Sequence, residues 1–201
     1  MMESLSETEV KLYVPDLEAV KARVEAAGGV LTAPRVFERN LRFDDQKRSL
    51  SQSGGVLRLR WDTRARLTFK DGGRVTGEHG STRFEAEVEV SDFETMHVIL
   101  YKLGFDPVFI YEKYRTTYAL GNTEVTLDEL PYGNFVEIEG EDSAIGRVVA
   151  QLELGGARRF DNSYSVLFTH VKRNLGLAFD HLTFENFKDM AIPEHAFRGA
   201  D

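Results

Sequence analysis

The stretch Glu7-Thr8-Glu9-Val10-Lys11-Leu12-Tyr13-Val14 decides the fold class, because charged and apolar side chains alternate along it. Successive side chains of a β-strand point to opposite faces, so Glu7, Glu9 and Lys11 are expected on one face and the valine and leucine side chains on the other. The stretch therefore predicts a strand with one charged face and one apolar face that packs on a core.

Later segments repeat this alternation. They are residues 57–61, 67–70, 84–90, 113–118, 125–128 and 136–139. One such strand alone is typical of a sheet with one face in water. Here, however, acidic strands and basic strands are separate, which indicates a ligand bound together with a metal ion. If about eight such strands close into an antiparallel barrel, the charged faces line a cavity and helices cover the outside.

Four helices are predicted from capping residues and apolar spacing. Asp16 is expected to cap a helix over residues 17–27. Ser91 and Glu94 have the spacing of a capping box for a second helix, which stops at Gly104. The other two helices are expected near residues 143–154 and 162–175.

The remaining segments predict turns and a C-terminal extension. Glycine pairs at 54–55, 72–73 and 155–156 are interpreted as turns. Apolar side chains after residue 176 indicate that the extension, about 176–201, docks on the body. We therefore expect an α+β fold with a closed antiparallel eight-stranded barrel, in a single domain over 1–201 with its core at about 6–175.

The composition narrows the function. The 201 residues include no cysteine, which excludes disulfides, thiolate catalysis and cysteine-bound zinc. The formal net charge of −8 argues against a surface that binds nucleic acid. With no signal-peptide pattern and no membrane-spanning run, we expect a cytoplasmic protein with no nucleic-acid or membrane partner. The five histidines lack metal-ligand spacing.

The charged faces carry the residue types that a polyphosphate and a metal ion require. Phosphate oxygens suit Arg forks and Lys point charges. The basic candidates are Lys11, Arg58, Arg60, Lys70, Lys113 and Arg115. A hard cation such as Mg²⁺ or Mn²⁺ takes carboxylate oxygens and also bridges phosphates. The acidic candidates are Glu7, Glu9, Glu85, Glu87, Asp128, Glu137 and Glu139.

These motifs resemble a known family. Glu7-Thr8-Glu9-Val10-Lys11 looks like the ExExK signature of CYTH proteins, also called triphosphate tunnel metalloenzymes. The companion motifs occur in the family's order: Leu57-Arg58-Leu59-Arg60, Leu67-Thr68-Phe69-Lys70, Arg83-Phe84-Glu85-Ala86-Glu87, Glu112-Lys113-Tyr114-Arg115, Leu127-Asp128-Glu129-Leu130 and Phe135-Val136-Glu137-Ile138-Glu139-Gly140. The resemblance covers about residues 6–175 and implies an eight-stranded tunnel assembled as a homodimer.

The resemblance also implies roles for the candidates. The six basic residues are expected to bind the triphosphate of a small-molecule substrate. Glu7, Glu9, Asp128, Glu137 and Glu139 are expected to bind Mg²⁺ or Mn²⁺, and Glu85 and Glu87 either bind metal or orient basic neighbours. Candidate proton acceptors are Lys113 and Lys70. Arg66 and Arg83 are possible extra phosphate contacts outside this set, and helix capping and packing are the preferred interpretation of Ser163-Tyr164-Ser165.

The resemblance to CYTH proteins leaves two reactions open for this site. The preferred one is hydrolysis of inorganic triphosphate, a nucleoside triphosphate or thiamine triphosphate. The alternative is a class IV adenylyl cyclase, which converts ATP to cyclic AMP and pyrophosphate and needs a purine pocket. Phe37, Phe43 and Trp61 are aromatic candidates for that pocket, although core packing explains them equally well. A third, less favoured possibility is a non-catalytic protein that binds polyphosphate.

Overall fold

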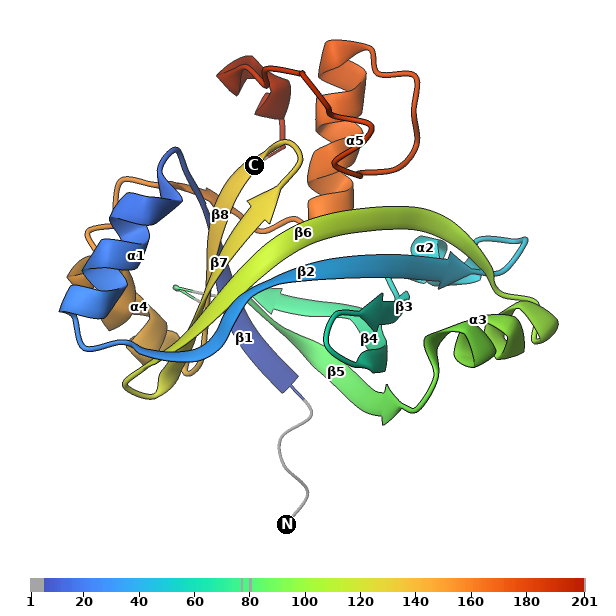
Figure 1. Ribbon diagram of the computed structural model, residues 1–201, viewed down its shortest axis with the longest axis horizontal. Coiled ribbons are helices and arrows are strands. Elements are labelled where there is room, and N and C mark those ends of the chain that lie inside the picture. Colours follow the sequence, from blue (N-terminus) through green and yellow to red (C-terminus); the bar gives the residue numbers. More distant parts are fainter. Residues whose placement is uncertain (1–5, 77, 80, 201) are drawn as a thin grey trace.

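The computed structural model describes residues 6–76, 78–79 and 81–200, apart from the side chains of residues 6–7, 73–76, 81 and 83. The strands are β1 Ser6–Val14, β2 Val30–Asp44, β3 Val56–Trp61, β4 Ala65–Thr76, β5 Ser81–Val90, β6 Asp106–Leu120, β7 Thr123–Leu130, β8 Gly133–Glu139 and β9 Arg158–Phe160. The helices are α1 Leu17–Ala26, α2 Ser49–Ser53, α3 Phe93–Lys102, α4 Asp142–Gln151, α5 Tyr164–Leu175 and the short 3₁₀ helix η1 Glu194–Phe197. The fold is α+β, with helices packed outside an antiparallel sheet (Figure 1).

The prediction of a closed eight-stranded barrel is wrong. The structure has one nine-stranded sheet in the order β5-β4-β3-β2-β6-β7-β8-β1-β9. β1 also meets β5, but only along the four pairs between Ser6–Glu9 and Ser81–Phe84. Further along β1, Lys11–Tyr13 pair with β9 instead, so β9 occupies the edge that full closure would require for β5. The sheet is therefore curled, and β2 and β6 arch over β5 in Figure 1.

The apolar faces of β1, β7 and β8 pack against two helices. Val10 and Leu12 of β1 join Val136 and Ile138 of β8 in a buried cluster with side chains of α1 and α4. Both helices lie together on the outside of the sheet (Figure 1). Burial of this cluster holds β1 and β8 with their charged faces turned the other way, toward the interior, as the alternation predicts.

A second cluster covers the outer face of β2 and β3. Leu41, Phe43 and Leu59 are buried there against Leu100 of α3. Because the side chains on each strand alternate, the neighbours of these residues, including Arg42, Arg58 and Arg60, face the interior. Two opposite packing surfaces therefore fix the inward direction of the charged residues.

The C-terminal extension packs on α5, β8 and β6. Phe187 and Phe197 of the extension are buried with Phe168 of α5 and Phe135 of β8. Leu182 forms backbone hydrogen bonds with β6 through Ile110 and Glu112. The prediction that this segment docks on the body is confirmed, and Figure 1 shows α5 and the extension together above the curled sheet.

Several local predictions need correction. α3 is capped by Asp92, whose carboxylate accepts from the Thr95 amide, because Asp92 rather than Ser91 occupies the N-cap position. Gly72 and Gly73 do not form a turn but lie within β4. A β-carbon on Gly72 would stand 1.7 Å from the Ser53 carbonyl oxygen, so this glycine allows α2 to approach the strand. Among the described residues, no helix is long and apolar enough to cross a membrane.

Candidate functional site

A charged cavity of about 250 Å³ lies on the inner face of the curled sheet. Its described lining holds eight basic and six acidic side chains, whereas the whole chain carries a net charge of −8. The lining residues are Glu9, Lys11, Arg42, Val56, Arg58, Arg60, Arg66, Lys70, Glu85, Glu87, Tyr111, Lys113, Arg115, Glu124, Thr126, Glu137, Glu139, Ser163, Tyr164 and Ser165. All six predicted phosphate-binding residues are among them.

Most of the predicted acidic residues also reach this cavity. Glu9, Glu85, Glu87, Glu137 and Glu139 line it. The backbone of Glu7 lies in β1, but its side chain falls outside the described residues, as does that of Arg83. Asp128 is fully buried beside the cavity and is not one of its lining residues. The assigned metal-binding roles of these acids remain predictions.

Asp128 is surrounded by hydrogen-bond donors. It accepts from Lys113 Nζ at 2.9 Å, from Arg115 Nε and Nη2 at 2.7 and 2.6 Å, and from the Tyr164 hydroxyl at 2.8 Å. A buried carboxylate needs such partners, because an unpaired charge is costly away from water. In this arrangement Asp128 fixes the directions of Lys113 and Arg115, which both line the cavity.

Glu38 is a buried acid that the sequence analysis missed. Its carboxylate lies 3.4 Å from Arg60 Nη1 and 3.5 Å from Lys113 Nζ, and the residue is only 2% exposed. Burial alone would raise the pKa of Glu38, but the charges of Lys113 and Arg60 outweigh it and hold the pKa well below its ordinary value. Glu38 therefore stays charged and positions two of the predicted phosphate-binding cations.

The expected separation of acidic from basic residues is not observed. Lys11 Nζ lies 2.9 Å from Glu137, and these two residues are cross-strand partners in β1 and β8. Lys70 contacts its partner Glu85 in the same way between β4 and β5. Acidic and basic residues look separate along the chain because each strand carries mainly one sign of charge. The register of the paired strands, however, places side chains of opposite charge next to each other.

Glu137 and Arg58 extend this ion-pair network. Glu137 contacts both Lys11 and Arg115; burial opposes its charged form, but these cations hold its pKa well below the ordinary value. Arg58 donates to Thr68 at 3.0 Å and lies 3.8 and 3.5 Å from Glu85 and Glu87. Lys113 and Lys70 are both held by carboxylates, which suits cations that bind phosphate; their role as proton acceptors stays a prediction.

One level of the cavity has an excess of negative charge. Glu139 of β8 stands directly opposite Glu9 of β1 on one side and Glu124 of β7 on the other. Burial and the charges of Glu124 and Glu9 raise the pKa of Glu139 to about 7. Glu124 was missed, although it shares the inner face with Thr126 and Asp128 and the same alternation identifies it.

Glu9, Glu124 and Glu139 form an acidic row that has the chemistry of a site for a hard cation. Carboxylate oxygens are the ligands that Mg²⁺ and Mn²⁺ prefer, and a cation there would relieve the repulsion around Glu139. Within the described part of the chain, no three acidic or histidine side chains are grouped as a ready metal site.

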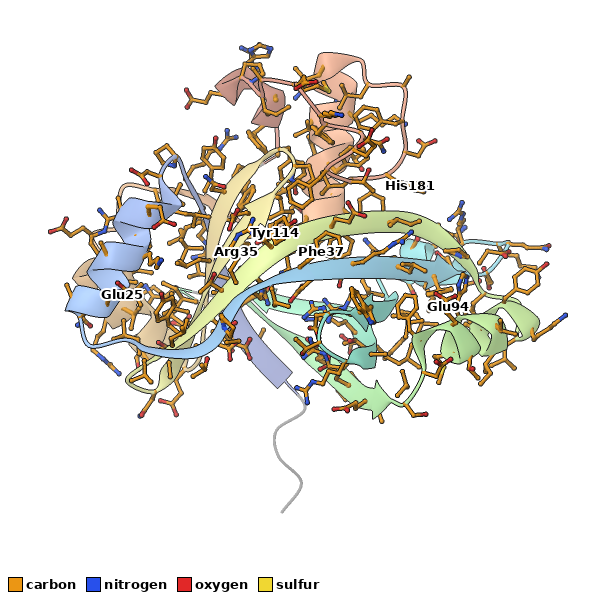
Figure 2. All side chains as sticks on the ribbon, viewed as in Figure 1. Glu25, Arg35, Phe37, Glu94, Tyr114 and His181 are labelled. Carbon is orange, nitrogen blue, oxygen red and sulfur yellow. The ribbon has the colours of Figure 1, made fainter. Side chains whose placement is uncertain are left out.

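The aromatic candidates for a purine pocket do not reach the cavity. Phe43 is buried in the outer cluster against α3, and Trp61 is 47% exposed. Phe37 packs on Tyr114, which also stacks with Arg35, and Figure 2 shows these three side chains grouped along β2 and β6. Core and surface packing therefore account for all three candidates.

The capping and packing expected of Ser163-Tyr164-Ser165 are observed only in part, because Tyr164 is buried in the core but the segment also reaches the cavity. Ser163 occupies the N-cap position of α5 but makes no capping hydrogen bond, and all three residues line the cavity. Ser165 instead contacts Arg42, another lining residue that the sequence analysis missed. No histidine is found among the described lining residues.

Comparisons with known proteins agree on one family. Residues 5–152 match the family model described as CYTH domain. A Methanocaldococcus jannaschii protein named "Putative adenylate cyclase" is 29% identical over 149 residues, which are 73% of this chain and 83% of that protein.

Solved structures show the same fold. A "putative adenylate cyclase" from Vibrio parahaemolyticus is 19% identical, with a TM-score of 0.70, and the match covers 83% of this chain and 99% of that one. HpAC1 from Hippeastrum is 20% identical, with a TM-score of 0.62, and the match covers 81% and 95%. It is described as a "putative adenylyl cyclase" that reveals a dominant triphosphatase activity.

Proposed function

Because this chain belongs to the CYTH family, we propose that it binds a triphosphate with a divalent cation in the charged cavity and hydrolyses it. The convergence of eight basic side chains on one cavity of about 250 Å³ carries this proposal. A triphosphate has several negative charges along a short chain, and several fixed cations are needed to bind it.

The basic residues would hold the phosphate chain and stabilise charge that develops during cleavage. Arg58, Arg60 and Arg115 offer planar donor forks, while Lys11, Lys70 and Lys113 offer point charges. Their carboxylate partners hold them in place before substrate arrives, so little reorganisation is needed during the reaction. Phosphate oxygens would then replace some of the carboxylate contacts.

The acidic row would hold the cation. Glu9, Glu139 and Glu124 are opposed across three strands, and their crowding supports a divalent ion at that level. A bound Mg²⁺ or Mn²⁺ would neutralise charge on phosphate oxygens and orient them. Glu85 lies near enough to raise the pKa of Glu139 as well, so it is a candidate for the same ion.

The size of the cavity favours a small substrate. Its volume of about 250 Å³ lies below the range of about 300–1,000 Å³ that is typical of sites for larger organic ligands. None of the three aromatic candidates for adenine lines it. These two observations support hydrolysis of a triphosphate over cyclisation of ATP.

The test is to incubate the purified protein with tripolyphosphate or ATP, with and without Mg²⁺ or Mn²⁺, and to separate orthophosphate, pyrophosphate and cyclic AMP. We expect metal-dependent orthophosphate release without cyclic AMP. Cyclic AMP with pyrophosphate would identify a cyclase, and binding without turnover would leave a binding protein.

A matched pair of variants localises the reaction. Arg58→Ala removes a lining guanidinium, and we expect a higher KM that increases further with salt, because phosphate contacts are largely electrostatic. Arg64→Ala is the control: Arg64 is exposed, pairs with Glu89 and does not line the cavity. If the two variants had equal kinetics, the reaction could not take place in this cavity.

A further inference from the structure

Tyr111 is a buried hydroxyl inside the cavity to which neither the motifs nor the family resemblance gives a role. It lies on β6, two residues before Lys113 and on the same inner face, and is 8% exposed. Its hydroxyl oxygen accepts from Arg58 Nη1 at 3.4 Å. The ring stacks on Phe109 at 5.8 Å, which fixes the direction of the hydroxyl.

The charges that act most strongly on Tyr111 are cations, namely Arg58 and Arg60 of β3, Lys113 of β6 itself and Arg42 of β2. Three acids contact these cations, Glu38 of β2 and Glu85 and Glu87 of β5, and the hydroxyl of Tyr132 nearby is neutral. Arginine and lysine side chains donate hydrogen bonds and accept none. Among the residues that the structure describes, none accepts a hydrogen bond from the Tyr111 hydroxyl. Its proton is therefore available to an anion in the cavity.

We propose that Tyr111 is a catalytic residue, which donates its phenolic proton to the phosphate oxygen that leaves when the triphosphate is cleaved. This inference rests on the proposed function and adds a general acid to it. A phosphate chain bound by Arg58, Arg60 and Lys113 would come within reach of the Tyr111 hydroxyl, because Arg58 hydrogen-bonds to that hydroxyl and all four residues line the same cavity.

The step balances as follows. The oxygen of water forms a new bond to the terminal phosphorus, and the bridging P–O bond breaks with its electron pair left on the pyrophosphate oxygen. That oxygen takes the proton of Tyr111, and orthophosphate keeps one proton of the water. The second water proton passes to solvent, and the phenolate of Tyr111 takes up one proton from solvent after the products leave, so no oxidant, reductant or further reactant is needed.

The surroundings make Tyr111 a stronger acid than tyrosine in water. Burial alone would raise its pKa, but the charges of Arg58, Arg60 and Lys113 outweigh burial and lower the pKa below its ordinary value. The same cations stabilise the phenolate that remains after proton transfer. A positioned general acid contributes about 10²–10⁴-fold to a rate.

The test compares Tyr111→Phe with Tyr13→Phe in the full chain. Both changes remove only a hydroxyl, but the Tyr13 ring packs against Phe135 and Phe197 and does not line the cavity. With tripolyphosphate and Mg²⁺, we expect Tyr111→Phe to lower kcat by about 10²-fold with little change in KM. Tyr13→Phe should keep the wild-type kcat.

The pH profile separates an acid from a merely structural group. An acid must be protonated to act, so kcat of the wild type should fall as pH rises through the pKa of Tyr111, and Tyr111→Phe should lose this fall. A rise in KM with kcat and pH profile unchanged would mean that Tyr111 only positions Arg58, and would overturn the inference. Thermal unfolding of both variants checks that they fold.

Failure of this inference is distinguishable from failure of the proposed function. If the wild type cleaves triphosphate and Tyr111→Phe does so at the same rate, only the role of Tyr111 is lost. If the wild type cleaves no triphosphate with either metal, the proposed function is lost and the general acid with it.

Discussion

Glu137 and Glu139 lie two positions apart on the same face of β8, yet their surroundings are opposite. Glu137 is the cross-strand partner of Lys11, and its pKa is held well below the ordinary value. Glu139 stands between Glu9 and Glu124, and burial with these like charges raises its pKa to about 7. The strand register alone therefore decides whether an inward carboxylate is neutralised by the protein or left in excess.

The contrast divides the cavity into two levels. The paired level consists of Lys11, Glu38, Lys113, Arg115, Asp128 and Glu137, in which each acid contacts at least one cation. The acidic level consists of Glu9, Glu124 and Glu139, where acids stand opposite acids, although Glu9 also lies 3.9 Å from Lys11 of the paired level. Cations of the paired level can exchange carboxylates for phosphate oxygens, while the acidic level attracts a metal ion.

The largest expected effect on stability is at the centre of the paired level. Asp128→Asn removes a fully buried charge that Lys113 and Arg115 contact, and we expect a loss of about 3 kcal/mol in the free energy of unfolding, measured with urea. Asp161→Asn is the control, because Asp161 forms a more exposed pair with Arg159 and should cost less than about 1 kcal/mol. Equal losses would contradict the division into levels.

A smaller effect with a defined pH dependence is expected at Glu38. The folded-state pKa of Glu38 is depressed, so its charge contributes stability above the ordinary pKa of about 4.5, and this contribution is lost as pH falls toward the folded-state pKa. Glu38→Gln should therefore cost about 2 kcal/mol at pH 7 and progressively less below pH 4.5. Unfolding curves across this pH range measure the difference in stability between the wild type and Glu38→Gln. A difference that does not change with pH would contradict the prediction.

At Glu139 the stability of the protein is expected to depend on pH in the opposite direction. Its folded-state pKa is raised, so the wild type loses stability as pH rises from about 4.5 through about 7. Glu139→Gln should stabilise the metal-free protein by about 1 kcal/mol above pH 7, because like charges opposite each other in a sheet cost up to about that amount. Below pH 4.5 the two proteins should be equally stable.

Metal binding tests whether the acidic level, and not another part of the protein, holds the cation. We expect Mn²⁺ to raise the melting temperature of the wild type and to raise that of Glu139→Gln less, because a ligand that binds the folded state stabilises it. Glu89→Gln is the control on β5, since Glu89 is exposed and pairs with Arg64 outside the cavity. An equal Mn²⁺ response in all three proteins would place the metal elsewhere.

The sequence could identify which residues face inward, because alternation is a local property of each strand. It thus predicted Lys11, Arg58, Arg60, Lys70, Lys113 and Arg115, all of which line the cavity. It also predicted α1 with its cap at Asp16, since Asp16 precedes the helix directly and accepts from the Ala19 amide. Both inferences use only neighbours along the chain.

What the sequence could not supply was the register between strands. The contacts Lys11 to Glu137 and Lys113 to Glu38 join residues far apart in the chain, so the charges looked separated by sign. β2 was missed because Pro34 and the exposed Arg39 interrupt its pattern, and with it Glu38 was lost. β9 has only three residues, too few for a periodic signal, and its place on β1 is why full closure was predicted wrongly.

The most direct test of the two-level cavity is a calorimetric titration of tripolyphosphate into the wild-type protein, in Mg²⁺ and again in a chelator. We predict one binding site, tighter with Mg²⁺ than without, whose affinity falls as salt is added and is weakened by Arg58→Ala. An absence of binding, or binding that neither Mg²⁺ nor Arg58→Ala changes, would contradict a cavity that holds phosphate on its cations and a metal ion on its acids.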